Sequence, residues 1–193
     1  MGFEITDGTG KGNKAGVDRT NRLLTRTINE NTFLYGAEEG DAYFIGAPII
    51  NLTSANESAI LYIKNNEDSP LILGQFFIIA ESTTGGSPNM VRVNFYRNPT
   101  SISSGTATSA LNQNFGSSKV LNTDIEYGAE GSTITGGALA ATLSFPIGTF
   151  NTIDANLVLE KGSSVVISYD PPAGNTSMDV TFGTRALKYE ENY

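Results

Sequence analysis

The sequence predicts an all-β fold: an antiparallel, jelly-roll-like β-sandwich of about eight strands, with one short helix and an extended N-terminal arm. Three observations lead to this prediction. Short apolar segments recur along the chain at spacings of roughly 10–20 residues, separated by polar turns. Glycine is frequent, with 21 residues, and charged residues make up 17% of the chain, below the usual ~25%. The 193 residues fit one domain, by the rule of about 150 residues per domain.

Residues 1–42 are expected to form the arm, and 43–193 the sandwich. The segment Asp7–Asn13 (DGTGKGN) has three glycines at alternate positions and no apolar residue, so it cannot offset the entropy of ordering its backbone. Further along, Asn31 as N-cap and Gly40 as stop predict a short helix between them. The apolar stripe of this helix is formed by Phe33, Leu34 and Ala37.

The first half of the sandwich contains four expected strands. Pro48 lies inside the first and indicates an edge or irregular strand, because proline cannot donate to a strand ladder. The third is apolar on both faces, which is typical of a strand in the middle of a sandwich. The fourth alternates, with Val91, Val93 and Phe95 expected to face inward and Arg92, Asn94 and Tyr96 outward. The four segments are Tyr43–Leu52, Ser58–Lys64, Leu71–Glu81 and Asn89–Arg97.

The long polar segment Asn98–Lys119 separates the two halves. Structureless loops of this length are uncommon in compact domains, so we expect a functional loop. Beyond it, Glu160–Ser163 (EKGS) predicts a hairpin turn between the strands on either side. In the last strand, Val180 and Phe182 are expected on one face. The segments of the second half are Val120–Tyr127, Thr133–Phe145, Ile153–Leu159, Ser164–Tyr169 and Met178–Tyr189.

The absence of Cys, His and Trp narrows the possible chemistry. It excludes disulfides, Cys-rich zinc sites, haem ligation through His or Cys, and relays that need imidazole or thiolate. Glycosidic chemistry needs two carboxyls about 5–10 Å apart across a cleft, and neighbouring acids on one turn do not supply that. We therefore expect no enzymatic activity, no cofactor and no metal, with calcium at Glu38, Glu39 and Asp41 as a minor alternative. The acid pairs, expected to be solvated, are Glu38/Glu39, Glu67/Asp68 and Glu190/Glu191.

Charge is distributed unevenly along the chain. Residues 1–26 hold five basic and three acidic residues, a net charge of +2, whereas residues 27–193 hold seven basic and 17 acidic ones, a net charge of -10. With -8 overall, the chain as a whole is not expected to bind nucleic acid or an anionic membrane. The sequence contains no apolar run of about 18 residues, the length that would predict a membrane span. The N-terminus lacks the features of a signal peptide.

The basic residues of the first 26 predict a segment that docks on an acidic protein surface. No aromatic residue lies between Lys11 and Arg26, which disfavours stacking on nucleic-acid bases. A solvated arm without a partner is the second interpretation, and nucleic-acid binding is the third. The candidate docking residues are Lys11, Lys14, Arg19, Arg22 and Arg26, with Leu23, Leu24 and Ile28 as apolar anchors.

A set of short segments covers most of the chain in order: Asp7–Asn13, Asn21–Leu23, Tyr62–Asp68, Arg97–Thr100, Asn112–Lys119, Thr133–Gly137 and Lys161–Ser164. In these segments the chain resembles virion structural proteins of tailed bacteriophages, most of all small head decoration (cement) proteins. The resemblance implies a homotrimeric β-sandwich, made in the host cytoplasm, that binds the major capsid protein on the outer surface of the icosahedral head. Its role would be to stabilise contacts between capsid subunits without any chemistry.

Two other interpretations stay open on the sequence. A tail- or fibre-associated virion protein has the same general features. A host-glycan-binding module would present tyrosines as an exposed platform, although aromatic residues are favoured in strands for packing alone. A hydrolase ranks below both, because no acid–base pair can be named. The strand tyrosines are Tyr43, Tyr62, Tyr96, Tyr127, Tyr169 and Tyr189.

Overall fold

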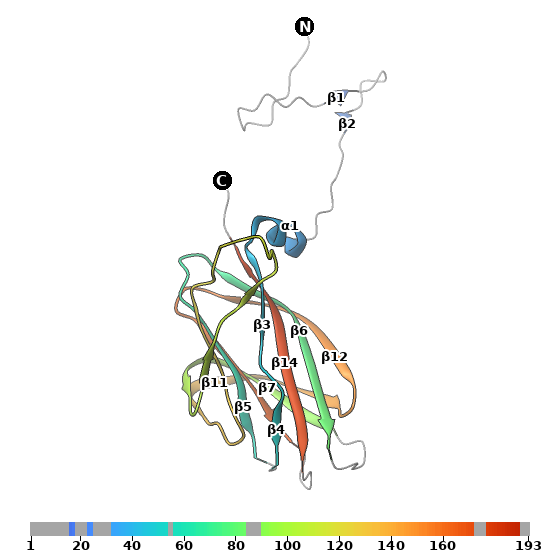
Figure 1. The fold of residues 1–193 in the computed structure, drawn as a ribbon, viewed down its shortest axis with the longest axis vertical. Coiled ribbons are helices and arrows are strands. Elements are labelled where there is room, and N and C mark those ends of the chain that lie inside the picture. Colours follow the sequence, from blue (N-terminus) through green and yellow to red (C-terminus); the bar gives the residue numbers. More distant parts are fainter. Residues whose placement is uncertain are drawn as a thin grey trace. The chain divides into compact units, whose positions relative to one another are not determined.

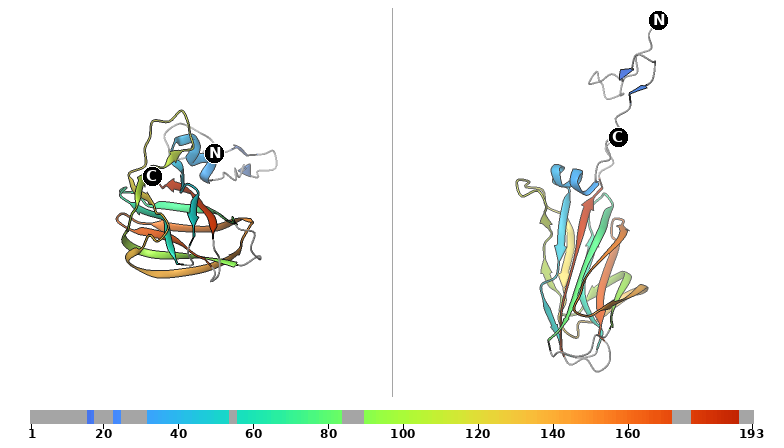
Figure 2. Two further views of the ribbon diagram at one scale, coloured as in Figure 1. Left: turned by 60° about the horizontal axis from the view of Figure 1, so that its bottom comes forward. Right: turned by 90° about the vertical axis from the view of Figure 1, so that its right-hand side faces the viewer.

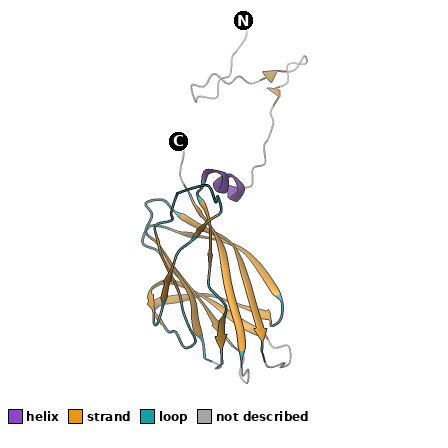
Figure 3. Ribbon diagram, in the orientation of Figure 1, coloured by secondary structure: helices purple, strands orange, loops and turns teal. Residues whose placement is uncertain are grey.

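The computed structural model describes residues 16–17, 23–24, 32–53, 56–83, 90–171 and 177–189 (Figure 1). Strands predominate beside one short helix (Figure 3), so the all-β prediction is confirmed. The elements are β1 (Gly16–Val17), β2 (Leu23–Leu24), α1 (Thr32–Glu39), β3 (Ala42–Gly46), β4 (Ile50–Leu52), β5 (Ser58–Asn65), β6 (Leu71–Ser82), β7 (Met90–Ile102), β8 (Thr106–Thr108), β9 (Leu111–Asn112), β10 (Thr123–Tyr127), β11 (Ile134–Pro146), β12 (Phe150–Leu159), β13 (Ser164–Asp170) and β14 (Met178–Lys188).

Contacts divide the chain into two compact units, Met1–Asn31 and Thr32–Tyr193. In the first unit, β1 and β2 pair antiparallel, with Gly16 opposite Leu24. The helix and all the other strands belong to the second unit. By its contacts α1 therefore goes with the sandwich, whereas the sequence analysis assigned it to the arm.

The second unit consists of two antiparallel sheets that face each other (Figures 1 and 2). The first sheet has the order β11-β7-β13-β5-β10-β8, and the second has the order β12-β6-β14-β3-β9, with β4 also paired to β14. Three pairs are nested along the chain: β5 pairs with β13, β6 with β12, and β7 with β11. Because a jelly roll brings early strands against late ones in this nested way, the jelly-roll-like prediction is also confirmed.

Within the described residues the sandwich has twelve strands, β3 to β14, rather than the predicted eight or so. Around Pro48 the first expected strand divides into β3 and β4, and both pair with β14. The segment Asn98–Lys119 is not structureless, which corrects the expectation of a long loop. β7 runs on to Ile102, β8 pairs with β10, and β9 pairs with β3.

The expectation of a hairpin at residues 160–163 was wrong. β12 pairs with β6 in the second sheet, whereas β13 pairs with β5 and β7 in the first. The turn therefore carries the chain from one sheet to the other. Gly162 adopts a φ of 80° there, and its amide donates to the carbonyl of Asn65 at 2.7 Å. Two alternating strands joined by a tight turn look the same in sequence whether they pair or cross between sheets.

The main core lies between the two sheets and follows the predicted alternation. Val91, Val93 and Phe95 of β7 are buried, and so are Val180 and Phe182 of β14. These side chains alternate with outward positions, as strand geometry requires.

The outer face of the first sheet is also partly covered. Asn94, which was expected to face outward, is only 6% exposed. The outward positions of β7 lie beside a second small apolar cluster. The predicted alternation of the strand was therefore right, but the expectation that its outward side chains are fully exposed to solvent was wrong. The buried members of this cluster are Ala59, Tyr62, Ile102 and Val166.

The helix α1 lies on the outer face of the second sheet, and Gly40 follows it with a φ of 82°, as the predicted stop requires. Two close contacts hold α1 against the sheet. A Cβ added to Gly74 of β6 would lie 2.4 Å from the ring of Phe33. One added to Gly36 of the helix would lie 2.2 Å from Leu187 of β14. The two glycines therefore let helix and sheet approach closely.

We expect Gly128→Ala to destabilise the sandwich. The new Cβ would lie 2.0 Å from the carbonyl oxygen of Ala59, a backbone atom that cannot rotate away. The expected loss is about 1–3 kcal/mol in the free energy of unfolding, measured by urea denaturation. Gly116→Ala is the control, because its Cβ would meet Asn114 Oδ1 at 3.4 Å, and it should change the free energy by less than about 0.5 kcal/mol. Equal losses in both variants would contradict the steric argument.

Candidate functional site

Most of the candidate docking residues lie outside the described residues. Leu23 and Leu24 are the exceptions, and they form β2, which pairs with β1. The docking role stays a prediction for all eight positions. The other six are Lys11, Lys14, Arg19, Arg22, Arg26 and Ile28.

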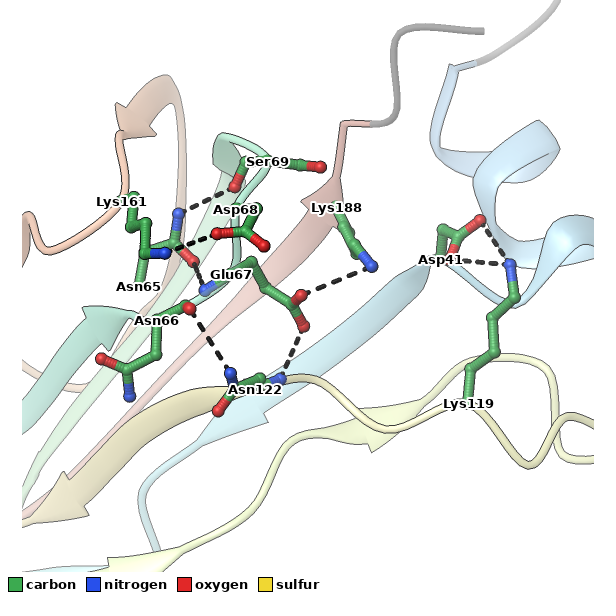
Figure 4. Close-up of polar contacts among 10 residues, drawn as sticks. All are labelled: Asp41, Asn65, Asn66, Glu67, Asp68, Ser69, Lys119, Asn122, Lys161 and Lys188. Carbon is green, nitrogen blue, oxygen red and sulfur yellow. Dashed lines mark hydrogen bonds and ion pairs between the residues drawn. The ribbon is translucent and has the colours of Figure 1, made fainter.

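At the end of the sandwich where α1 lies, ion pairs and hydrogen bonds join neighbouring loops (Figure 4). The side chain of Asp41 is 12% exposed, and its Oδ2 lies 2.8 Å from Lys119 Nζ. Glu67 lies between two partners: Lys188 Nζ is 3.4 Å from its Oε2, and the backbone amide of Asn122 donates to its Oε1 at 2.7 Å. These contacts fasten the loop before β10 to β3 and β14.

The turn between β5 and β6 is organised by a buried asparagine. Asn65 Nδ2 donates to the carbonyls of Leu159 at 2.8 Å and Ser69 at 3.0 Å. Beside it, Asp68 binds Lys161 of the turn at 160–163, and this hydrogen bond lowers the pKa of Asp68. The polar contacts of Figure 4 thus join neighbouring loops at this end of the sandwich.

Three acidic residues at this end, Asp41, Glu67 and Asp68, are engaged in ion pairs. Glu67 was expected to be solvated, but its side chain is 12% exposed and paired with Lys188, so that expectation was wrong. Asp68 is 90% exposed. Glu38 and Glu39 are exposed. Within the described residues, no group of three or more carboxylates lies together in a way that would hold a metal ion.

A second polar cluster, the Glu57 cluster, lies on the outer face of the first sheet. Glu57 Oε1 accepts hydrogen bonds from Asn94 Nδ2 at 2.8 Å, from the Tyr96 hydroxyl at 2.9 Å and from the Ser168 hydroxyl. Thr142 Oγ1 in turn donates to Asn94 Oδ1 at 2.7 Å. Glu57 directly precedes β5, and its partners lie on β7 and β13. Thr142 of β11 joins the cluster through Asn94, so the cluster ties four neighbouring strands together.

A pocket of about 260 Å³ opens beside the Glu57 cluster, with Glu57, Tyr96, Ser132 and Thr133 among its lining residues. Burial, together with the hydrogen bond and charge of Glu57, raises the pKa of Tyr96 to about 12. The phenol is therefore protonated near neutral pH and donates to the carboxylate. Carboxylate and hydroxyl groups around a pocket are suitable partners for a hydroxyl-rich ligand such as a sugar.

Sequence reasoning missed the Glu57 cluster. Glu57 lies in a polar segment before a strand, where an acid is usually solvated, and Asn94 and Tyr96 read as ordinary outward positions. The pairing of β5, β13 and β7 joins Glu57 to residues 37, 39 and 111 positions away. A single sequence holds no local signal for contacts at that separation.

An apolar cleft of about 380 Å³ opens between β11 and β12, which are the edge strands of the two sheets. Leu143, Ile153 and Leu157 pack against the core from these strands, yet they are only partly buried. Arg97 and Glu160 are among its few charged lining residues. The sandwich is therefore open along this side.

The strand tyrosines are used mainly for packing. Tyr43, Tyr62 and Tyr169 are buried, and the Tyr169 hydroxyl donates to the carbonyl of Thr181 at 3.0 Å. Burial raises the pKa of Tyr169 above the ordinary tyrosine value. Of the six strand tyrosines, Tyr189 is the most exposed at 43%, so these residues do not form a common platform.

Comparisons of the chain with protein-family models, curated proteins and solved structures found no match. What the molecule does must therefore be argued from its own residues. In the part of the chain that the structure describes, no helix has the length and apolar character needed to cross a membrane.

We expect Tyr96→Phe to reduce the loss of stability at high pH. Because the pKa of folded Tyr96 is raised to about 12 from about 10 in an unfolded chain, its contribution is present below pH 10 and is lost as the pH rises through 12. Unfolding by urea at pH 8 and pH 11.5 measures the difference. Thr142→Val is the control, since it removes a hydrogen bond from the same cluster without removing a titrating group. An unchanged pH dependence in Tyr96→Phe would contradict the assignment.

Proposed function

We propose that this protein is a non-enzymatic virion component that decorates the outside of a phage head. In this role its N-terminal segment docks on the major capsid protein and its sandwich lies outward. The observation that carries the proposal is the division of the chain. Residues 1–26 have a net charge of +2 and residues 27–193 a net charge of -10, and contacts separate the chain between Asn31 and Thr32.

The described residues support a binding role in preference to a catalytic one. Asp41, Asp68 and Glu67 at the α1 end form ion pairs with Lys119, Lys161 and Lys188, respectively. Glu57 accepts three hydrogen bonds on one oxygen. No described pair of carboxyls faces across either of the two pockets, whereas hydrolysis of a glycosidic bond needs such a pair.

A short segment can provide stable binding to a capsid through three physical contributions. A basic segment and an acidic capsid surface attract each other over about 8 Å at physiological salt, which favours encounter. Apolar anchors such as Leu23 and Leu24 then add area that is removed from water. When several copies on one assembly bind neighbouring capsid subunits, the effective concentration of each segment rises and dissociation slows.

We expect deletion of residues 1–30 to leave the sandwich folded and to abolish retention on the head. The measurement is co-sedimentation with undecorated, expanded heads built from the major capsid protein encoded in the same genome. The full chain should bind saturably at a fixed ratio to the capsid subunit, and binding should weaken as salt increases. Circular dichroism checks that the truncated protein keeps its strands.

Two variants with the same net charge distinguish binding by the basic residues of the arm from an effect of net charge alone. Replacing the five basic residues of the arm by Gln should abolish binding to heads. Replacing five body cations by Gln gives the same net charge and should leave binding intact. The arm set is Lys11, Lys14, Arg19, Arg22 and Arg26, and the body set is Lys64, Arg92, Arg97, Lys161 and Arg185. Binding by the arm variant would contradict the docking role, and no binding of the full chain to heads would favour the tail or fibre alternative.

A second candidate function, binding of host glycans, is favoured by the pocket beside the Glu57 cluster. If this pocket binds sugars, Tyr96→Ala should lower retention on a glycan panel at least about tenfold, because it removes a hydroxyl donor and an apolar ring face. Tyr35→Ala is the control, since Tyr35 lies on α1, away from the pocket. A chain that binds no glycan on the panel would leave decoration as the proposal.

A further inference from the structure

β11 and β12 form an exposed edge on one side of the sandwich. β11 pairs with β7 and β12 with β6, so among the described residues each strand ends its sheet and leaves one row of backbone groups without a strand partner. Natural proteins usually protect such edges with charged side chains. β11 has no charged residue in its 13 positions, and β12 has one, Asp154, in its 10.

The edge is also apolar and open to solvent. Leu139 of β11 is 55% exposed, and Phe150 and Val158 of β12 are 60% and 56% exposed. The cleft of about 380 Å³ lies between the two strands. Inward-facing side chains such as Leu143 and Leu157 line this cleft and are only partly buried. By register Leu139 lies on the outer side of the first sheet, opposite Tyr96, and Val158 lies on the outer side of the second, opposite Ile72, so exposed apolar side chains flank the cleft on both sides. Exposed apolar side chains beside an apolar cleft are typical of a protein contact.

The size of the edge matches that of a stable interface. β11 and β12 have 13 and 10 residues, and a specific interface uses roughly 20–30 residues a side. Leu159 is the one buried residue in these two strands. The exposed positions of the two strands, which alternate with positions that pack against the core, are thus spread along both strands rather than gathered in a local patch.

We infer that the β11–β12 edge is the contact surface between copies of this chain. The choice of partner follows from charge. Residues 27–193 carry a net charge of -10, so two sandwiches repel each other wherever their acidic surfaces meet, and like charges brought together cost several kcal/mol. The nearly uncharged edge is where that repulsion is smallest. A basic partner would bind the acidic surfaces instead, because the nearly uncharged β11–β12 edge offers it little electrostatic attraction.

Contact between copies also removes the exposed features described above. Apolar side chains of one copy cover the cleft of another, and the free strand edges pair or become shielded from other chains. Small residues on β11, among them Gly136, Gly137 and Ala138, allow the backbones to approach closely. This inference does not rest on the proposed function, because it concerns the free protein and holds with or without a capsid.

The test is the molar mass of the full chain in solution, by sedimentation velocity and light scattering over about 1–100 μM, the range of weak to moderate interfaces. The interface variant is L139E/V158E. The control is F115E/V120E, which has the same net charge and replaces side chains that are 86% and 83% exposed elsewhere on the sandwich. Urea denaturation checks that both variants fold. If L139E/V158E does not fold, L139S/V158S replaces it.

We expect the wild-type chain and F115E/V120E to form the same closed oligomer. L139E/V158E should be monomeric or should raise the dissociation constant at least about tenfold for each substitution. Three results would each overturn the inference. These are a wild-type monomer throughout the concentration range, an oligomer that persists unchanged in a folded interface variant, and an oligomer that the control substitutions disrupt equally.

Discussion

The sandwich depends on a contact of three phenylalanine rings between its two sheets. Phe76 and Phe182 come from the second sheet and Phe95 from the first. The ring centroids of Phe76 and Phe95 are 5.5 Å apart, and those of Phe95 and Phe182 are 6.4 Å apart, both pairs meeting edge to face. Each ring is at most 6% exposed, so burial adds to the ~0.5–1.5 kcal/mol of an aromatic pair. The nested pairs β5/β13, β6/β12 and β7/β11 bring these strands into position, and the three rings belong to one buried core cluster between the sheets.

The surroundings of this core differ from one part of the sandwich to another, and the difference reflects how each residue type is best satisfied. At the α1 end, Asn65, Glu67 and Asp41 are largely buried, so each needs a partner, and ion pairs and backbone hydrogen bonds supply it. The Glu57 cluster meets the same requirement on the outer face of the first sheet. Along β11 and β12 there is almost no charge to satisfy, and partly buried apolar side chains are left beside an open cleft.

Sequence reasoning succeeded where the signal is local. The alternation that buries Val91, Val93 and Phe95, the short helix that ends before Gly40, and the interruption at Pro48 all depend on neighbouring residues, and the structure has each of them. It failed where the answer depends on which strands pair. The turn at 160–163 has hairpin composition but connects two sheets, and Glu57 finds its partners on β7 and β13, far away in the sequence. The docking role of the arm remains a prediction from charge and spacing.

The proposed docking of the N-terminal segment and the inferred contact between copies would respond oppositely to salt. Docking by a basic segment on an acidic partner is electrostatic and is screened as ionic strength rises. Contact through the neutral β11–β12 edge is apolar and gains from salts that are excluded from protein surfaces, while salt also screens the repulsion between acidic sandwiches. On these two proposals the chain would associate with itself under conditions that release it from a charged partner, and the two contacts would be physically independent. Such independence suits a protein that assembles first and binds a larger particle afterwards, since neither contact has to compete with the other for the same residues.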